Sequence, residues 1–210
     1  MQRRSWAILA LLVVTVGTLA GCALFNQPPT ANFTWTPSDP LARTDVQFTD
    51  LSTDTGGIVS WSWDFGDNGS SPLQNPTHKY TKSGTYPVKL TVTDGDGSSK
   101  TLQKTITVTA SLDGVWEGGI VNPGRIREDF VMRFHHSASG GISGDIVYAG
   151  VVVNPSSISF NEVSKQVKFD IPAMGIRLEG TLDPSETMIR GTWYVLGAPA
   201  QGFTWDVTLR

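Results

Sequence analysis

Aromatic residues on alternate positions constrain this chain more than any other feature. Trp61, Trp63 and Phe65 alternate with polar residues, and an acidic, glycine-containing turn sequence follows them. Successive side chains of a β-strand point to opposite faces, so the three rings are predicted to lie on the buried face of one strand. Asp64 and Asp67 are predicted to be turn-forming carboxylates that accept backbone N–H groups, rather than catalytic groups.

The same alternation continues further along the chain. In residues 84–108, two alternating runs are joined by the turn sequence Asp-Gly-Asp-Gly. With 22 Gly and 12 Pro and no long amphipathic repeat, the composition favours an all-β chain of short strands. About seven short strands between residues 30 and 109 predict a small β-sandwich.

The segments SWDFGDNG, NPTHKYTKSGTYPVKLTVTD and ITV occur in this order and resemble the polycystic kidney disease (PKD) repeat, an immunoglobulin-like β-sandwich. The resemblance covers residues 28–109, and the predicted domain is 30–109. Asn68 stands where the family usually has glycine, and the pair Asn68-Gly69 still suits a turn that needs positive φ. The resemblance implies a spacer domain with a contact surface for a protein or glycan partner.

Some members of the PKD family bind calcium, so a structural calcium ion is the alternative interpretation of the acidic turns. The candidate ligands are Asn32, Asp54, Asp64 and Asp94, whose oxygen atoms could converge at one end of the sandwich. The sequence contains no contiguous twelve-residue calcium loop. Turn formation is therefore the preferred interpretation, and no other cofactor is expected.

The N-terminal segment has the features of a secretion signal. Arg3 and Arg4 precede an apolar run that ends at Ala20 and is shorter than the ~20 residues needed to span a bilayer. The alternative is an uncleaved transmembrane anchor. Leu-Ala-Gly-Cys at 19–22 resembles the lipobox of bacterial lipoproteins, which implies diacylglyceryl transfer to the Cys22 thiol and cleavage before it.

Residues 1–21 are accordingly predicted to be a signal peptide, and residues 22–29 a lipidated tether. The resemblance implies a protein anchored by its acyl chains in the bacterial cell envelope, facing the periplasm or the exterior. In a source with two membranes, the outer membrane is expected. Several acyl chains on one residue would hold the chain firmly, since each buried methylene contributes ~0.8 kcal/mol.

Cysteine count and charge exclude several classes of function. A single cysteine rules out an internal disulfide and a Cys-rich zinc site. The formal net charge is -3, and no cluster of Lys and Arg occurs after the first few residues. Nucleic acid is therefore not an expected partner, because binding to phosphates needs a basic surface.

Residues 111–210 form a second predicted β domain. Alternating runs near 129–136, 143–153, 156–161, 165–171, 175–183 and 187–195, with one run at each end of the segment, give about eight strands. Eight meandering strands predict a small closed antiparallel β-barrel, which removes exposed edges. Gly114-Val115-Trp116 resembles the Gly-x-Trp of lipocalins, so the domain is only loosely lipocalin-like or avidin-like.

A small barrel is either filled by side chains or holds one small ligand. The candidate ligand-binding residues are Trp116, Tyr148, Trp193 and Trp205, and the alternative is that they are ordinary core aromatics. The ligand itself is not specified by the sequence.

The sequence favours a protein without enzymatic activity. His135 and His136 are adjacent on a predicted strand, so they face opposite sides and cannot jointly bind one metal. Nucleophile elbows, His-Glu-x-x-His helices and phosphate-binding glycine loops do not occur. The acidic residues Glu117, Glu128, Asp129 and Asp145 show no spacing typical of a catalytic pair and are interpreted as solvated strand ends.

These observations favour a lipid-anchored envelope protein in which the PKD domain presents the C-terminal domain for non-covalent binding. The first alternative is a lipocalin-like carrier of a small apolar ligand. The second is part of a polysaccharide- or protein-degrading enzyme, because PKD repeats often accompany such catalytic domains.

Overall fold

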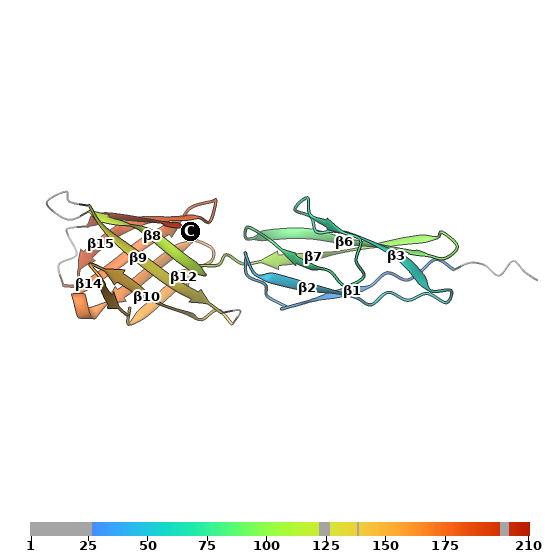
Figure 1. The fold of residues 1–210 in the computed structure, drawn as a ribbon, viewed down its shortest axis with the longest axis horizontal. Helices are drawn as coiled ribbons and strands as arrows, with labels where there is room; N and C mark the ends of the chain where they lie inside the picture. The colour runs from blue at the N-terminus through green and yellow to red at the C-terminus, as the bar shows by residue number, and fades with distance from the viewer. Residues whose placement is uncertain (1–26, 122–126, 138, 198–201) are drawn as a thin grey trace, which may run out of the picture.

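The computed structural model describes residues 27–121, 127–137, 139–197 and 202–210, and the protein is all-β. Two β domains lie end to end, and the described chain begins at the end of the first domain that is remote from the second (Figure 1). The predicted signal peptide, Cys22 and most of the tether lie outside the described residues. Within the described part, no helix is long and apolar enough to cross a membrane.

The first domain contains the seven strands that the alternation predicts. One sheet has the order β1-β2-β5 and the other β4-β3-β6-β7, as in a two-layered sandwich (Figure 1). The strands are β1 (Phe33–Thr36), β2 (Asp45–Asp50), β3 (Ile58–Asp64), β4 (Ser70–Ser71), β5 (Thr77–Lys79), β6 (Gly84–Asp94) and β7 (Ser99–Val108).

The aromatic residues in β3 and directly after it supply much of the sandwich core, as predicted. Trp63 and Phe65 are 1% exposed, and the Trp63 ring lies 5.1 Å from Phe33 and 5.5 Å from Phe48. Trp61 is half-buried, and its indole Nε1 donates a hydrogen bond of 2.7 Å to Asp50. Each fully buried aromatic side chain contributes about 1.5–3 kcal/mol, a large share of the stability of a small domain.

The acidic residues at the end of β3 and directly after it form turns, which confirms the structural interpretation of this stretch. Asp64 Oδ1 accepts the backbone N–H of Gly66 at 2.9 Å, and Asp67 Oδ1 accepts that of Gly69 at 3.0 Å. Asn68 has a φ of 75°, the positive value that its position in the turn requires.

His78 fixes the same turn from the neighbouring sheet. Its ring stacks on Phe65 with centroids 4.1 Å apart, and its Nε2 lies 2.8 Å from Asp67 Oδ2. A Cβ at position 69 would lie 2.6 Å from the His78 ring, so the ring requires glycine there. The Tyr80 hydroxyl donates to the Phe65 carbonyl, and burial raises the Tyr80 pKa. The histidine, glycine and carboxylate side chains of this motif therefore stabilise the turn after β3 together.

The second domain is one curled sheet of nine strands. Their order is β11-β10-β9-β8-β16-β15-β14-β13-β12. The strands are β8 (Gly114–Val121), β9 (Arg127–His136), β10 (Ile142–Tyr148), β11 (Val151–Val153), β12 (Ser157–Asn161), β13 (Gln166–Ile171), β14 (Ile176–Leu182), β15 (Met188–Val195) and β16 (Phe203–Leu209). A 3₁₀ turn, η1 (Pro172–Met174), precedes β14.

The prediction of a closed eight-stranded barrel is wrong in two respects. The first and last strands do pair, β8 with β16, but β11 and β12 are the two edges of the sheet and leave it open. The predicted strand at 143–153 is a hairpin, because Ala149 and Gly150 both have positive φ, 49° and 77°. Two such residues form the turn that matches strand twist, and alanine at the first position lacks the usual Asn or Asp signature.

Strand glycines allow the sheet to curl tightly. A Cβ at Gly118 would meet the backbone of Asp206, and one at Gly191 would meet the backbone of Glu179. A Cβ at Gly180 would lie 2.6 Å from the indole of Trp205, so this glycine makes room for a core tryptophan. Glycines at close approaches are the usual means of bending a sheet strongly.

Replacement of Gly66 by alanine is expected to destabilise the first domain by about 2–5 kcal/mol, from backbone strain plus overpacking. Gly66 has a φ of 83°, and a Cβ there would lie 2.7 Å from Pro87 Cδ and 2.9 Å from its backbone nitrogen. Equilibrium urea unfolding measures the loss.

The matched control is Gly97→Ala, because Gly97 has a similar φ of 88° and open space around the added methyl group. It is expected to cost only the strain, about 1 kcal/mol. Equal losses in the two variants would contradict the close packing of Gly66 on Pro87.

Candidate functional site

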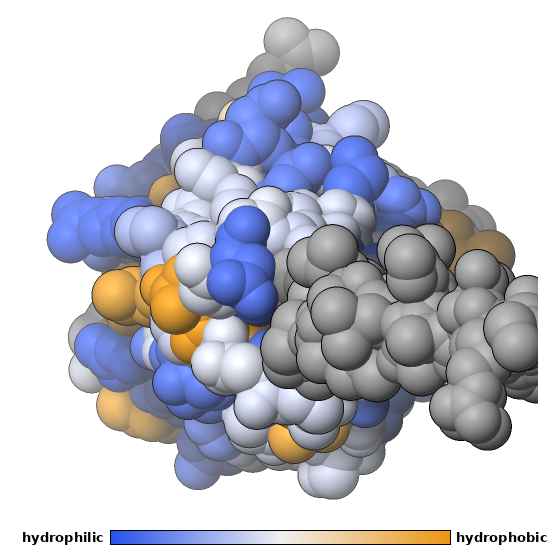
Figure 2. Space-filling view, turned by 90° about the vertical axis from the view of Figure 1, so that its right-hand side faces the viewer, coloured by the Kyte–Doolittle hydropathy of each residue, from blue (hydrophilic) through white to orange (hydrophobic). Residues whose placement is uncertain are grey.

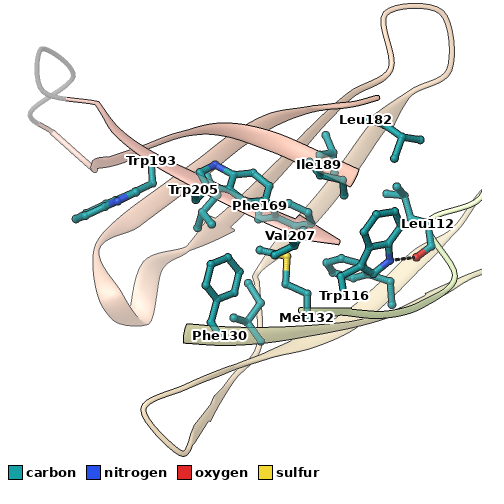
Figure 3. Close-up of a cluster of buried hydrophobic side chains, with 14 of the residues drawn as sticks. Leu112, Trp116, Phe130, Met132, Phe169, Leu182, Ile189, Trp193, Trp205 and Val207 are labelled. Atoms are coloured by element: carbon teal, nitrogen blue, oxygen red, sulfur yellow. Dashed lines mark hydrogen bonds between the residues drawn. The ribbon is translucent and has the colours of Figure 1, made fainter. Parts of the chain in front are cut away.

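A continuous apolar core fills most of the interior of the second domain. Figure 3 shows Trp116, Met132, Phe169, Trp205 and Val207 from facing strands pointing toward one another. Phe134 and Phe169 stack with ring centroids 5.2 Å apart, and Phe169 lies edge-on to Trp205 at 6.0 Å. Among the residues that the structure describes, side chains therefore fill the middle of the curled sheet.

The core gives way to an apolar pocket at one end of the sheet. Its volume is about 100 Å³, and its lining side chains are apolar or aromatic: Ile120, Phe130, Ile146, Tyr148, Ile171, Met174, Ile176, Leu178 and Trp193. In Figure 3, Trp193 and Leu112 lie at opposite ends of the cluster. Leu112 belongs to the segment that joins the two domains, so the pocket lies at the end remote from the first domain.

Trp193 carries an unpaired polar group at this pocket. The side chain is 9% exposed, and its Nε1 is buried without a hydrogen-bond partner among the residues that the structure describes. Its ring packs on Phe203 with centroids 4.8 Å apart, which holds the indole in place. An unsatisfied buried donor destabilises the folded state by about 1–3 kcal/mol. An apolar side chain would fill the same space in the core without this loss.

The other predicted ligand-binding residues divide into two kinds. Tyr148 is half-buried and lines the same pocket as Trp193. Trp116 Nε1 donates to the Leu112 carbonyl at 2.8 Å, and Trp205 Nε1 donates to the carbonyls of Thr192 and Glu179. Trp116 and Trp205 are thus satisfied core residues, while Tyr148 and Trp193 remain candidates for binding.

The four candidate calcium ligands are placed in separate local structures. Asp54 caps a turn at Gly56, Asp64 accepts from Gly66, and Asp94 Oδ1 accepts from the N–H groups of residues 96 and 98. Asn32 Oδ1 accepts from Phe33 N and from a lysine ammonium. Only Asp94 retains a buried oxygen, Oδ2, without a partner. Among the residues that the structure describes, no three His, Cys, Asp or Glu side chains form a metal-binding group.

A cluster of polar residues connects the two domains, and we call it the domain clamp: Arg43, Ser83, Glu162, Lys165 and Glu186. Glu186 is only 4% exposed, and its carboxylate accepts hydrogen bonds from both the backbone N–H (3.0 Å) and the hydroxyl of Ser83. Lys165 Nζ lies 3.6 Å from the same carboxylate and 3.3 Å from that of Glu162. Arg43 donates to the carbonyls of Glu186 and Ser111.

Backbone hydrogen bonds hold the turn that carries Glu186 in the clamp. Glu186 has a φ of 60° in the β14–β15 turn, where Asp183 Oδ1 accepts the N–H groups of Thr187 (3.0 Å) and Met188 (2.9 Å). Burial lowers the pKa of Arg43, although the negative charges of Glu186 and Asp113 oppose this effect. Glu186 is the buried charge of the clamp, and loss of its partners would leave a desolvated carboxylate unpaired.

A larger hollow of about 670 Å³ lies beside the clamp, between Leu41 and Thr109 of the first domain and His136, Phe160 and Glu162 of the second. His136 is buried and His135 is 75% exposed, which confirms that the two histidines face opposite sides. His136 Nδ1 accepts the N–H of Leu112 at 3.4 Å, and burial lowers the His136 pKa. The histidine thus stabilises the joint between the domains in its neutral form.

The remaining acidic candidates lie at the surface of the second domain. Glu117, Asp129 and Asp145 pair with Arg210, Arg127 and Arg133, respectively. Ion pairs of this exposed kind contribute about 0–1 kcal/mol and agree with the interpretation as solvated strand ends.

Sequence reasoning missed the clamp and the unpaired indole nitrogen. Arg43 and Glu186 are 143 residues apart, and Ser83 and Glu186 are 103 apart, so no local pattern brings them together. The only signal in the sequence is the short connection between the last strand of one domain and the first of the next, which forces neighbouring turns into contact.

Comparison with known proteins identifies the first domain. Residues 26–110 match the PKD domain family, so this part of the chain is a PKD domain. The pre-pro-metalloprotease PrtV of Vibrio cholerae is 44% identical over 77 residues, which are 33% of this chain and 8% of that protein. The chain therefore spans less than a tenth of the length of this relative.

Two solved structures are also similar. The PKD1 domain of Vibrio anguillarum Epp is 39% identical to this chain, with a TM-score of 0.38. The alignment covers 41% of this chain and 99% of the Epp domain. A structure described as a carbohydrate-binding module of the β-sandwich superfamily is 22% identical and covers 88% of this chain and 92% of that one, with a TM-score of 0.40.

The burial of His136 makes the stability of the protein depend on pH. Its folded pKa lies below the value of about 6.5 in an unfolded chain, so the unfolded chain binds more protons between these two values. The stabilisation is complete above about pH 6.5 and is lost as the pH falls through the folded pKa.

Unfolding free energies measured between pH 7.5 and 5 are expected to decrease for the natural chain and to change less for His136→Gln. The control His135→Gln removes an exposed histidine and should retain the natural slope. An identical slope in the His136 variant would contradict the buried, neutral histidine.

Proposed function

We propose that the protein is a lipid-anchored component of the bacterial cell envelope whose PKD domain is a rigid spacer for a C-terminal binding domain. The observation that carries this proposal is that the start of the described chain and the apolar pocket lie at opposite ends of the two-domain molecule. The described chain begins at the outer end of the PKD domain, and the apolar pocket lies at the outer end of the second domain (Figures 1 and 3). An anchor at the first end would direct the pocket away from the membrane.

The anchor itself rests on the sequence of residues 1–22. Two arginines, a short apolar run and a cysteine after small residues occur in the order that lipobox processing needs. The visible end of the PKD domain is mostly hydrophilic, with small separate hydrophobic areas outside the grey atoms (Figure 2). Such a surface offers little apolar area for insertion into a bilayer, so attachment would depend on the acyl chains of Cys22.

The spacer role is supported by the domain clamp. Five polar residues from four turns and loops meet at the joint, and Glu186 is almost completely buried there. Two domains joined only by a flexible linker would move independently. The clamp instead favours one fixed orientation of the two domains relative to each other. In that orientation the PKD domain separates the anchor from the binding site.

Binding without covalent chemistry is the activity that the C-terminal domain supports best. Among the described residues that line its pocket, the Tyr148 phenol is the only carboxylate, histidine or hydroxyl group. The three histidines make contacts with Asp67, Asp113 and the Leu112 N–H, which fit structural roles. A carrier that encloses a whole lipid is disfavoured by the volume of 100 Å³, because sites for drug-sized ligands have about 300–1,000 Å³.

A second candidate is an accessory role beside protein degradation. It is favoured by the 44% identity between this PKD domain and part of a metalloprotease. In this case the PKD surface, rather than the pocket, would contact a protein partner. Binding of the full chain to immobilised protein substrates of such enzymes tests this role. The binding should be lost when a soluble copy of the PKD domain is added as a competitor.

Replacement of Cys22 by serine is expected to abolish lipid attachment, because serine lacks the thiol that accepts the diacylglyceryl group. Intact-mass measurement and Triton X-114 partition should show an unmodified chain in the aqueous phase. The matched control Ala23→Ser leaves the thiol in place and should remain in the detergent phase. A Cys22→Ser protein that still enters the detergent phase would support a transmembrane anchor instead.

Replacement of Glu186 by alanine is expected to release the two domains from their fixed orientation, since Ser83 loses its acceptor and Lys165 loses one of its carboxylates. Nuclear magnetic relaxation should give one rotational correlation time for both domains of the natural chain and two different values for the variant.

The control Glu179→Ala removes a half-buried carboxylate that pairs with Lys168 at 3.0 Å and is hydrogen-bonded to Tyr194, and that takes no part in the domain clamp. It should leave a single correlation time. Two correlation times in the natural chain would overturn the rigid spacer.

A further inference from the structure

We propose that the hollow between the two domains binds a neutral molecule with several hydroxyl groups, such as one sugar residue, and that His136 Nε2 donates a hydrogen bond to it. The proposed function places binding at the outer end of the second domain, so this is a further site, at the joint. It rests on the fixed orientation that the clamp favours, because both domains supply its walls.

The size and position of the hollow are those of a small-molecule site. Its volume is about 670 Å³, and sites for drug-sized ligands have about 300–1,000 Å³ and often lie between domains. Asp39 and Leu41 line it from the PKD domain, and Ile142 and Phe160 line it from the second domain. A monosaccharide is smaller than the ligands that such sites hold, so it fits in this space.

His136 provides a hydrogen-bond donor at the hollow. The residue is 6% exposed, and its Nδ1 accepts the N–H of Leu112 at 3.4 Å, so the proton of the neutral ring lies on Nε2. Among the residues that the structure describes, Nε2 has no hydrogen-bond partner, and unlike Trp193 Nε1 it is not closed off from solvent. Because His136 lines the hollow, this is where its Nε2 meets solvent.

Glu162 provides the complementary acceptor. Its Oε2 accepts hydrogen bonds from the Ala110 N–H at 3.2 Å and from Lys165 at 3.3 Å, while Oε1 has no partner in the described part of the chain. The side chain is 37% exposed and lines the hollow. A hydroxyl group both donates and accepts, so the hydroxyls of one molecule can bond to Glu162 and to His136 together.

The charges around the hollow disfavour an anion. Asp39 and Glu162 line it, and no lysine or arginine of the described residues is part of its lining. A carboxylate in the ligand would be repelled by both side chains. An ammonium group would suit the two carboxylates, but it cannot accept the hydrogen that His136 Nε2 donates. A neutral hydroxylated molecule meets both requirements.

Apolar side chains favour a ligand with carbon surface over water. Ile142, Ile158 and Phe160 are half-buried and line the hollow. Water beside such groups has few polar partners, so its displacement by the carbon–hydrogen face of a sugar ring is favourable. Phe160 lies edge-on to His136 with ring centroids 6.3 Å apart, so this apolar surface is next to the donor.

The test titrates the full chain carrying Cys22→Ser with the methyl glycosides of glucose, galactose and mannose, followed by nuclear magnetic resonance of the backbone amides. At least one of these glycosides is expected to bind with a dissociation constant of about 1 mM, as ordinary ligand efficiency gives for a molecule of this size. Each is compared with its uronate, in which a carboxylate replaces the hydroxymethyl group. The uronate should bind about 3- to 10-fold more weakly.

His136→Phe keeps a ring and removes the donor. It is expected to weaken binding of the glycoside about 3- to 10-fold, because one hydrogen bond is lost. The matched control is His135→Phe at the neighbouring position. That side chain is 75% exposed and faces the opposite side of the strand, so the control should keep the natural affinity.

A second pair of variants leaves the buried histidine in place. Ser159→Trp adds a bulky side chain at a residue of β12 that lines the hollow, and it should abolish binding. Ser157→Trp is the control, because Ser157 is also exposed on this strand and is not part of the lining. The proposal is overturned if no glycoside binds, if the uronates bind as tightly as the glycosides, if His136→Phe keeps the natural affinity, or if the two tryptophan variants bind equally.

These outcomes are separate from those that test the proposed function. The Cys22 and Glu186 variants test the anchor and the rigid joint without any ligand. Absence of glycoside binding would remove the site at the joint and leave both of those results unchanged.

Discussion

The antiparallel pairing of β8 with β16 is the constraint on which the second domain depends. It joins the first and last strands of this domain, so the seven strands between them must curl around a common interior. Val207 lies opposite Gly118 in this ladder, and the absence of a side chain at Gly118 allows the close approach to Asp206. The apolar core, and the pocket where that core ends, exist because this pairing brings the two halves of the sheet face to face.

Polar contacts then determine how the two domains are oriented relative to each other. The PKD domain has its own core around Trp63, and the second domain has its own around Trp205, so neither needs the other for hydrophobic burial. The joint is made instead by charged groups such as Glu186 and Lys165 and by the neutral ring of His136. Directional contacts of this kind specify an orientation more strongly than a flat apolar interface would.

The sequence predicted those features that depend on local periodicity. Alternation along residues 30–109 was sufficient for the seven strands of a sandwich, and the resemblance of its motifs to the PKD repeat added the family; the turn at Asp64 followed from its residue types. It failed at Ala149, where alanine adopts a positive φ that its chemistry does not favour and a hairpin replaces one long strand.

Long-range partners were beyond the reach of such patterns. Trp193 and Trp205 lie on neighbouring strands and both point to the interior, yet only Trp205 reaches the carbonyls of Thr192 and Glu179. Similarly, nothing near Glu186 in the sequence indicates that it is buried against another domain.

The open side of the sheet has a mechanical consequence. Strand β11 has a ladder on one side only, and Val151 and Val152 are 62% and 58% exposed, so the β10–β11 hairpin is held less firmly than any closed strand pair. The same hairpin supplies Ile146 and Tyr148 to the pocket. The cavity thus has one wall on β10, directly beside the edge strand β11, and another on β15 in the interior of the sheet.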